Sequence, residues 1–184
     1  MPSGGAQLGF IIIGCLAGSY LKNARIITMF CFTMISVCGV VMMYALDPAM
    51  KSGRMAGFCL MMAFVANMPL GLSLISSNVG GFTKKTVVNS MFFVAYCIGN
   101  IIGPQFFYTS EAPSYPTGIT ASLCGFCLGC FFLLSMRLYL MWENRRRNRK
   151  YGVVDAASNL AEDAATTADT DLTDKQNTNF RYMM

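Results

Sequence analysis

Amide and phenol side chains recur at helical spacing within one apolar stretch of the sequence. Asn89, Tyr96 and Asn100 are seven and four residues apart, so an α-helix places them within a narrow arc of one face. A polar stripe that faced lipid would be costly, and this stripe must therefore face other helices or water. It either lines a substrate path or forms hydrogen bonds between helices, and the spacing alone leaves both interpretations open.

Two other apolar stretches carry groups that suit a substrate path. Asn67 precedes Pro69, and a proline inside a helix removes a backbone donor and kinks or breaks the helix. Interrupted helices often form transporter binding sites, while a kink with a purely structural role would have the same sequence. Gln7 shares a helical face with Gly14 and Gly18. We therefore predict that Gln7 and Asn67 join the stripe along a substrate path, and that Pro69 kinks its helix.

Glycine pairs at a spacing of four residues indicate where helices could pack closely. Such pairs allow the backbones of two membrane helices to approach each other. They are Gly5–Gly9, Gly14–Gly18, Gly99–Gly103 and Gly125–Gly129. The repetition of this spacing predicts a tightly packed helical bundle and carries no information about chemistry.

The residue types argue against an enzyme or a metal site. The sequence has no histidine, which removes the commonest general base and the commonest metal ligand. Cys124, Cys127 and Cys130 have a spacing that invites a metal or redox interpretation. Thiolates inside lipid are expensive, however, and no second ligand set is present. We predict that these cysteines are small packing residues, and that the chain is not an enzyme and uses no cofactor or metal.

Long apolar segments make up most of the chain. Its composition is 54% hydrophobic and 12% charged, and a soluble domain has roughly twice that charged fraction. Strands of a membrane barrel would be about ten residues long and alternate in polarity, whereas these segments approach the ~20 residues of a membrane-spanning helix. We predict an all-α polytopic membrane protein with a bundle over residues 1–142. Its spans are about 5–21, 26–46, 55–75, 87–107 and 118–141.

Basic residues are distributed unevenly between the connecting segments. The loops on one side hold Lys51 and Arg54, and the other side holds the remaining basic loop residues. These are Lys22, Arg25, Lys84, Lys85, Arg145, Arg146, Arg147, Arg149 and Lys150. Because a basic excess marks the cytoplasmic side, we predict that the C-terminal tail is cytoplasmic. Attraction of residues 145–150 to anionic lipid headgroups is a second interpretation, and nucleic-acid binding is not needed to explain the charge.

The composition changes near the C-terminus. From about Tyr151, the residue types Ala, Thr, Asp and Asn dominate through Asn179. Few apolar side chains are available to offset the entropy lost on ordering. We predict that residues 143–184 form a cytoplasmic and largely disordered tail.

Several local motifs together resemble a known transporter family. They are Ser77-Asn-Val-Gly-Gly-Phe-Thr-Lys-Lys-Thr86 with Asn89, then Tyr96-Cys-Ile-Gly-Asn-Ile-Ile-Gly-Pro-Gln105, Ala112-Pro-Ser-Tyr-Pro-Thr-Gly118 and Asn179-Phe-Arg-Tyr-Met183. The combination resembles the allantoate permease family of fungal anion:cation symporters, within the major facilitator superfamily. The resemblance implies helices eight to twelve of a twelve-helix fold. It also implies transport of small organic anions such as allantoate or carboxylated vitamins, usually with protons.

The leading hypothesis is a secondary active transporter of small organic anions in the plasma membrane. In it, Gln7, Asn67, Asn89, Tyr96 and Asn100 line the substrate path. The resemblance implies that helices one to seven are missing, so a partner with the N-terminal half would complete the cavity. An odd number of spans with an internal C-terminus places Met1 outside, which fits this hypothesis. The alternative is a truncated, non-transporting membrane fragment or subunit.

Overall fold

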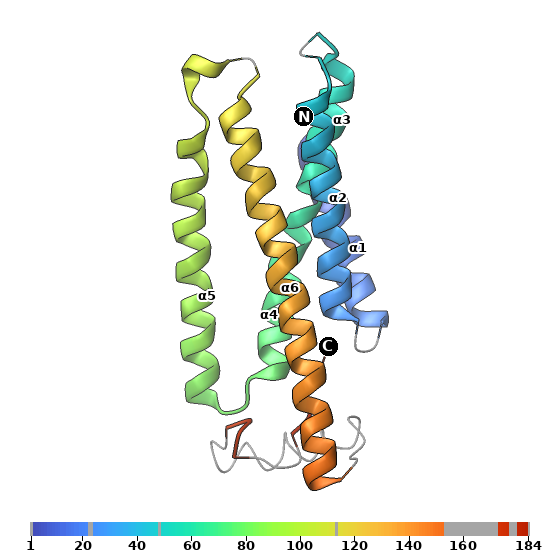
Figure 1. The fold of residues 1–184 in the computed structure, drawn as a ribbon, viewed down its shortest axis with the longest axis vertical. Coiled ribbons are helices and arrows are strands. Elements are labelled where there is room, and N and C mark those ends of the chain that lie inside the picture. Colours follow the sequence, from blue (N-terminus) through green and yellow to red (C-terminus); the bar gives the residue numbers. More distant parts are fainter. Residues whose placement is uncertain are drawn as a thin grey trace.

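The chain folds into a bundle of long helices that run side by side (Figure 1). The computed structural model describes residues 2–21, 24–47, 49–112, 114–152, 173–176 and 180–183. Within these ranges every regular element is a helix and no strand occurs. The prediction of an all-α polytopic membrane protein is confirmed.

Four helical stretches are long and apolar enough to cross a membrane, and α1 adds a shorter apolar helix. This result agrees with the five predicted segments, of which the first is the shortest. The α-helices are α1 (Pro2–Tyr20), α2 (Arg25–Ala45), α3 (Lys51–Met61), α4 (Asn67–Asn78), α5 (Phe82–Ile102) and α6 (Pro116–Tyr151). Three short 3-10 segments lie between them: η1 (Met62–Ala66), η2 (Gly103–Phe106) and η3 (Thr109–Glu111).

One membrane-spanning stretch is interrupted in its middle. Lys51–Asn78 comprises α3, η1 and α4 in one run of 28 residues, and the helix tightens to 3-10 geometry over Met62–Ala66. Pro69 is the third residue of α4, so it has no N–H to donate to the Val65 carbonyl and its ring crowds that group. The irregular turn therefore lies just before Pro69, where the α-helical hydrogen bond cannot form.

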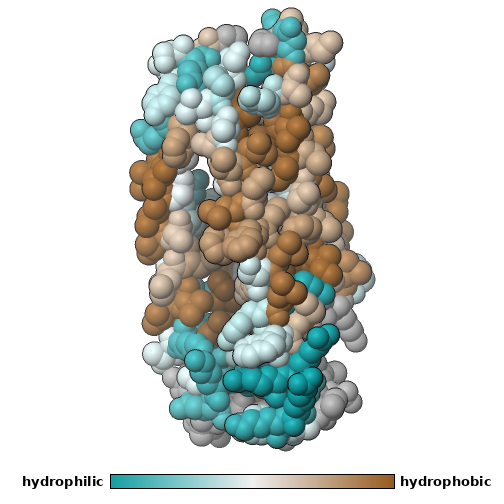
Figure 2. Space-filling model, in the orientation of Figure 1, coloured by the Kyte–Doolittle hydropathy of each residue, from teal (hydrophilic) through white to brown (hydrophobic). Residues whose placement is uncertain are grey.

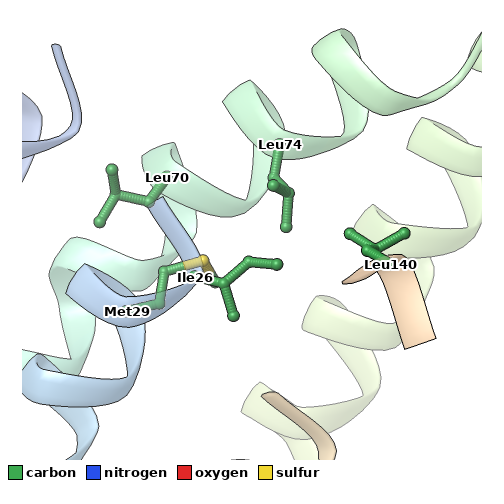
Figure 3. Packing of buried hydrophobic residues seen from close by; sticks show 5 residues of the cluster. All are labelled: Ile26, Met29, Leu70, Leu74 and Leu140. Atoms are coloured by element: carbon green, nitrogen blue, oxygen red, sulfur yellow. The ribbon is translucent and has the colours of Figure 1, made fainter. Parts of the chain in front are cut away.

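Two hydrophobic clusters hold the helices together. The larger one joins α2, α4 and α6 through Ile26, Met29, Leu70, Leu74 and Leu140 (Figure 3). The second cluster comprises Phe32, Ala63 and Ala66, with Phe10 of α1 packed against it. Because Ala63 and Ala66 belong to η1, the interrupted turn is itself enclosed by α1 and α2.

The predicted glycine pairs differ in what they contact. A Cβ added at Gly14 would lie 2.8 Å from Ala66 Cβ, and one added at Gly18 would lie 2.5 Å from Leu70 Cδ2. Gly5, Gly9, Gly99, Gly103, Gly125 and Gly129 have no such neighbour within 4 Å. Only one of the four pairs therefore permits a close helix approach within the described residues. The closest approach to another backbone involves Gly39, where a Cβ would lie 2.5 Å from the Met61 nitrogen and 2.6 Å from the Gly57 carbonyl oxygen.

Helix α6 is longer than the apolar segment that it contains. The sequence predicts the last span to about residue 141 and the tail from residue 143, whereas α6 continues to Tyr151. Glu143 forms ion pairs with Arg146 at 2.9 Å and with Arg147 at 3.1 Å. Pairs at these helical spacings favour the helix beyond the point at which hydrophobicity ends.

The C-terminal segment, defined as residues 173–176 and 180–183, packs against the end of the bundle that carries Lys84 and the last turns of α6. We call this end the basic end. Asn144 donates to the Tyr182 carbonyl at 2.8 Å and accepts from the Tyr182 N–H at 3.0 Å. Asn78 makes the same pair of bonds with Met183, at 2.8 and 2.6 Å. The tail predicted as disordered is therefore docked over these residues, and its remaining positions lie outside the described ranges.

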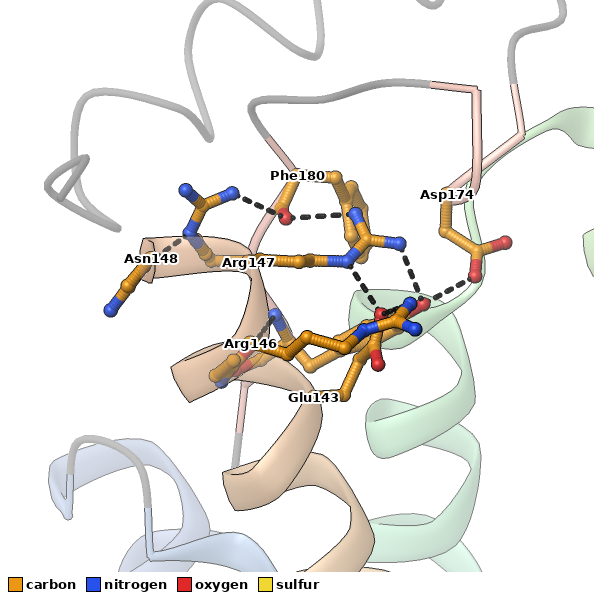
Figure 4. Close-up of polar contacts among 9 residues, drawn as sticks. Glu143, Arg146, Arg147, Asn148, Asp174 and Phe180 are labelled. Carbon is orange, nitrogen blue, oxygen red and sulfur yellow. Dashed lines mark hydrogen bonds and ion pairs between the residues drawn. The ribbon is translucent and has the colours of Figure 1, made fainter. Parts of the chain in front are cut away.

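Charged contacts surround this docked segment (Figure 4). Asp174 is paired with Lys84 and accepts a hydrogen bond from the Tyr182 hydroxyl at 2.7 Å. Burial alone would raise the pKa of Asp174, but these two partners more than offset it, and the pKa lies below its usual value of 3.8. Because the pKa of Asp174 is lowered when the segment is docked, the ionised carboxylate stabilises docking at any pH above the ordinary pKa of the group. This contribution is lost as the pH falls below about 4.

We expect Asn144→Ala to release the C-terminal segment. The substitution removes both bonds to Tyr182, each worth about 1 kcal/mol, so amide hydrogen exchange over residues 180–183 should accelerate about tenfold or more. Exchange measured by mass spectrometry in detergent tests this. Asn100→Ala, at a distance from the segment, is the control. Unchanged exchange in the Asn144 variant would show that the two bonds do not hold the segment.

We expect Gly39→Ala to destabilise the bundle by about 1–3 kcal/mol, because the new methyl group would overlap backbone atoms of α3 and overpack the contact. Thermal unfolding in detergent measures the effect. Gly125→Ala is the matched control, since a Cβ at that position meets no atom within 4 Å. Equal melting temperatures for the two variants would contradict the α2–α3 packing described above.

Candidate functional site

A cavity of about 610 Å³ lies between α1, α2, the η1–α4 region and α5. We call it the interhelical cavity. Its polar lining comes from Gln7, Asn67, Tyr96 and Asn100. Its apolar lining comes from Met29, Met62, Phe64, Val65, Met68, Phe92 and Gly99. None of the described lining residues is charged, so any ligand there would meet hydrogen-bonding groups and apolar surface.

The structure brings four of the five predicted path residues to this one cavity. Gln7 comes from α1, Asn67 from the first position of α4, and Tyr96 and Asn100 from α5. Asn89 does not line the cavity, although its Oδ1 is buried without a hydrogen-bond partner in the described structure. Asn89 is therefore not part of the cavity lining. Of the three polar residues on this face of α5, Tyr96 and Asn100 line the cavity and Asn89 lies outside it.

Asn67 is the most constrained polar group of the cavity. Its Nδ2 donates to Thr33 Oγ1 at 2.8 Å, and Thr33 Oγ1 donates in turn to the Met29 carbonyl at 2.8 Å. The Thr33 proton is thus committed to the backbone, which leaves the Thr33 oxygen as an acceptor and fixes the orientation of the Asn67 amide. Thr33 carried no signal in the sequence, because a lone threonine in an apolar helix commonly bonds only to its own backbone.

The oxygen of this amide has no hydrogen-bond partner among the described residues. Asn67 Oδ1 is buried and accepts no hydrogen bond from any described residue. An unsatisfied buried acceptor costs about 1–3 kcal/mol. The 3-10 turn at Met62–Ala66 ends at this residue, so the interruption of the helix positions the amide at the cavity. Asn67 is therefore ready to accept a hydrogen bond from an N–H or O–H group of a ligand or of water.

Helix α5 contributes the least constrained wall. None of its residues is buried, and half of the Tyr96 surface is exposed. Asn100 Nδ2 donates to the Tyr96 carbonyl at 2.8 Å, while Phe92 packs against α4, 3.3 Å from the Cβ position of Gly71. This wall meets α4 near Phe92 and leaves the hydroxyl of Tyr96 and the amide oxygen of Asn100 available.

Arg137 is a further polar residue of the helical part that sequence reasoning did not assign to a site. Arg137 lies within the apolar part of α6, and its Nη1 is buried without a hydrogen-bond partner in the described ranges. Intramembrane charges are rare because they are costly. Arg137 is not among the residues that line the interhelical cavity.

The sequence is similar to fungal transporters along its whole length. An uncharacterized transporter of Schizosaccharomyces pombe is 33% identical over 182 residues, which cover 99% of this chain and 34% of the relative. The allantoate permease of Saccharomyces cerevisiae is 29% identical over 193 residues, covering 100% of this chain and 34% of the permease. An MFS-type transporter of Penicillium expansum is 30% identical over 152 residues, which cover 81% of this chain and 29% of the relative.

The chain is homologous to fungal transporters of the allantoate permease type. This finding confirms the resemblance to that group of major facilitator transporters, and the relatives are named as transporters and not as enzymes. No family model matches the chain, and no solved structure matches it. The chain spans about a third of the length of the relatives that it matches.

We expect Thr33→Val to destabilise the helical bundle by about 1 kcal/mol, the scale of a hydrogen bond between membrane helices. The change keeps the shape of the side chain and removes the acceptor of the Asn67 amide. Thr28→Val is a matched control, because Thr28 is also buried and its Oγ1 donates to the Ala24 carbonyl of its own helix. Thermal unfolding in detergent compares them, and equal effects would argue against the Thr33–Asn67 bond.

Proposed function

We propose that the interhelical cavity forms one wall of the substrate site of a secondary active transporter for small organic anions. The observation that supports this most is the buried and unpaired Asn67 Oδ1 at a cavity with a neutral, amide-rich lining. Ligand pockets are mostly apolar and hold a few convergent polar groups, and this cavity has that character. Asn67, Gln7, Tyr96 and Asn100 are the residues that we propose for substrate contact.

The chemistry of the lining suits a substrate with both a carboxylate and N–H groups. The side chains of Gln7, Tyr96 and Asn100 can donate hydrogen bonds to carboxylate oxygens, and Asn67 Oδ1 can accept one from an N–H. A ureido acid contains both kinds of group. The similarity to an allantoate permease supports the same substrate class. We therefore propose ureide-type anions such as allantoate as the first candidates.

Proton coupling and the complete cavity require groups beyond this chain. The relatives extend over about three times its length, and we propose that further helices, corresponding to an N-terminal half, close the cavity opposite α5. These would also carry the protonatable residue that couples transport to the proton gradient, because the described lining contains no acid. In this arrangement the four candidate spans and the shorter apolar helix α1 correspond to helices eight to twelve of a major facilitator fold.

We propose that the basic end faces the cytoplasm of a plasma-membrane protein. Arg25 reaches Ser77 at 2.5 Å, and Lys84 is paired with Asp174 next to the end of α6. Arg54 donates instead to the Ser114 carbonyl, which belongs to the α5–α6 connection. The two sets of basic residues thus lie at opposite ends of the bundle. We propose that the end with the larger set is the cytoplasmic one.

A non-transporting membrane fragment or subunit is the second candidate. The observation that favours it is α5, a 21-residue helix without a buried residue. An apolar helix with so little internal packing needs lipid or another helix against most of its surface. In this case the chain would bind a partner in the membrane and would move no substrate itself.

Uptake of labelled allantoate distinguishes these candidates. The chain is expressed in yeast without its own allantoate permease, alone and together with the N-terminal two-thirds of a relative. We expect uptake in the second case, and a loss of about tenfold or more with Asn67→Leu, because the buried acceptor is removed. Cys127→Ala, an exposed position outside the cavity, is the control. Uptake in neither arrangement, with both polypeptides present in the membrane, would favour the non-transporting candidate.

A further inference from the structure

One face of α6 changes from apolar to aromatic to basic along its length. We call this the outer face of α6. At 100° per residue, its members fall within a narrow arc. In chain order they are Phe131, Leu134, Leu138, Trp142, Arg145 and Arg149. The first four side chains are exposed by 45–63%, so about half of this face is left uncovered by the described elements. Figure 2 shows the same transition on the surface, from brown in the middle of the molecule to teal at the basic end.

Two hollows adjoin this face at the basic end. They have volumes of about 470 and 400 Å³ and share Trp142, Arg146 and Lys150. The smaller hollow is completed by Arg145 and Arg149. Its five described lining residues are one tryptophan and four cations, and no acid of the described ranges contributes. We call this smaller hollow the headgroup hollow.

Two acidic groups near the hollows lie within the described residues, and both are already engaged. Glu143 lines the larger hollow, where its Oε1 accepts hydrogen bonds from Arg146 and Arg147. Asp174 is paired with Lys84. Neither Arg145 nor Arg149 has a hydrogen bond or ion pair to a described residue. The headgroup hollow therefore holds positive charge that the described part of the chain does not neutralise.

Aromatic rings order two of these cations. The Arg146 guanidinium lies 5.5 Å from the centre of the Trp142 ring, and Lys150 Nζ lies 5.1 Å from the centre of the Tyr151 ring. Stacking of this kind restrains long side chains that would otherwise lose entropy on binding. Arginine presents a planar fork of donors that matches phosphate oxygens. A phosphate group is thus the anion that the hollow fits.

The apolar part of the face identifies the source of that phosphate. Tryptophan side chains gather at the level of lipid headgroups, so Trp142 marks the depth at which hydrocarbon gives way to water. Above it, Leu138, Leu134 and Phe131 continue the same face into the apolar part of α6. A dissolved phosphate would use only the basic part, whereas a phospholipid would use both.

We propose that the outer face of α6 binds one anionic phospholipid. Its phosphate lies in the headgroup hollow against Arg145, Arg146 and Arg149, and one acyl chain follows Trp142, Leu138 and Phe131. Orientation of the protein by its basic residues needs only charge near the membrane. Orientation alone does not require arginines that lie on the same helical face as a tryptophan and an apolar strip. A bound phospholipid does require this arrangement.

Trp142 is the single tryptophan of the sequence and reports directly on this site. The full chain is reconstituted in bilayers that contain equal fractions of brominated anionic or brominated zwitterionic phospholipid, and quenching of Trp142 fluorescence is compared. We expect stronger quenching by the anionic lipid. Arg145→Gln with Arg149→Gln should lower the preference of the protein for anionic over zwitterionic lipid about fivefold for each charge removed. Arg145→Lys with Arg149→Lys should retain most of this preference.

The control removes two charges elsewhere. Lys51→Gln with Lys85→Gln changes the net charge equally and should leave the preference intact. Equal quenching by the two brominated lipids, or an equal loss in the control, would overturn the proposal in favour of general surface attraction. Inorganic phosphate is added as a second arm. Relief of quenching by phosphate alone, at constant ionic strength, would overturn the assignment to a lipid.

Discussion

Backbone N–H and C=O groups have no water to bind inside a hydrocarbon layer, and the structure depends on this constraint. Helices meet it because each segment satisfies its own backbone, and long apolar segments accordingly form α2, the α3–α4 stretch, α5 and α6. The 3-10 interruption at Met62–Ala66 occurs where Phe32 and Phe10 enclose the chain. Irregular backbone at membrane depth is tolerated in such a place, because protein covers the side of the 3-10 turn that carries Ala63 and Ala66.

The same constraint gives the few polar side chains of the bundle their importance. Thr33 satisfies one half of the Asn67 amide, and nothing described satisfies the other half. The Asn89 oxygen and the Arg137 Nη1 share this unsatisfied condition. Each of these groups would gain from water, a substrate or a further helix, because an unpaired polar atom in a low-dielectric setting is costly. The half-enclosed cavity and the exposed α5 fit a chain that matches about a third of its relatives.

At the basic end, the direction in which a side chain points decides its task. Arg147 turns inward, where it bonds to Glu143 and the Phe180 carbonyl and lies 5.1 Å from the Tyr182 ring centre. Arg145 and Arg149 turn outward beside Trp142. A single run of basic residues thus contains one group that docks the C-terminal segment and another that lines the hollow beside Trp142. Composition alone says only that both groups are positively charged. The helical period places them on different faces of α6.

The length and polarity of the apolar segments determined the helical class, and spacing alone placed Tyr96 and Asn100 on one face, because local periodicity fixes which side of a helix a residue occupies. The neighbours of each face depended on the tertiary structure. Thr33 meets Asn67 and Gly14 meets Ala66, whereas the identically spaced Gly125 meets nothing. Docking of Tyr182 on Asn144 joins residues 38 positions apart, and no local pattern encodes such a contact. Periodicity specifies a surface, and only packing decides what covers it.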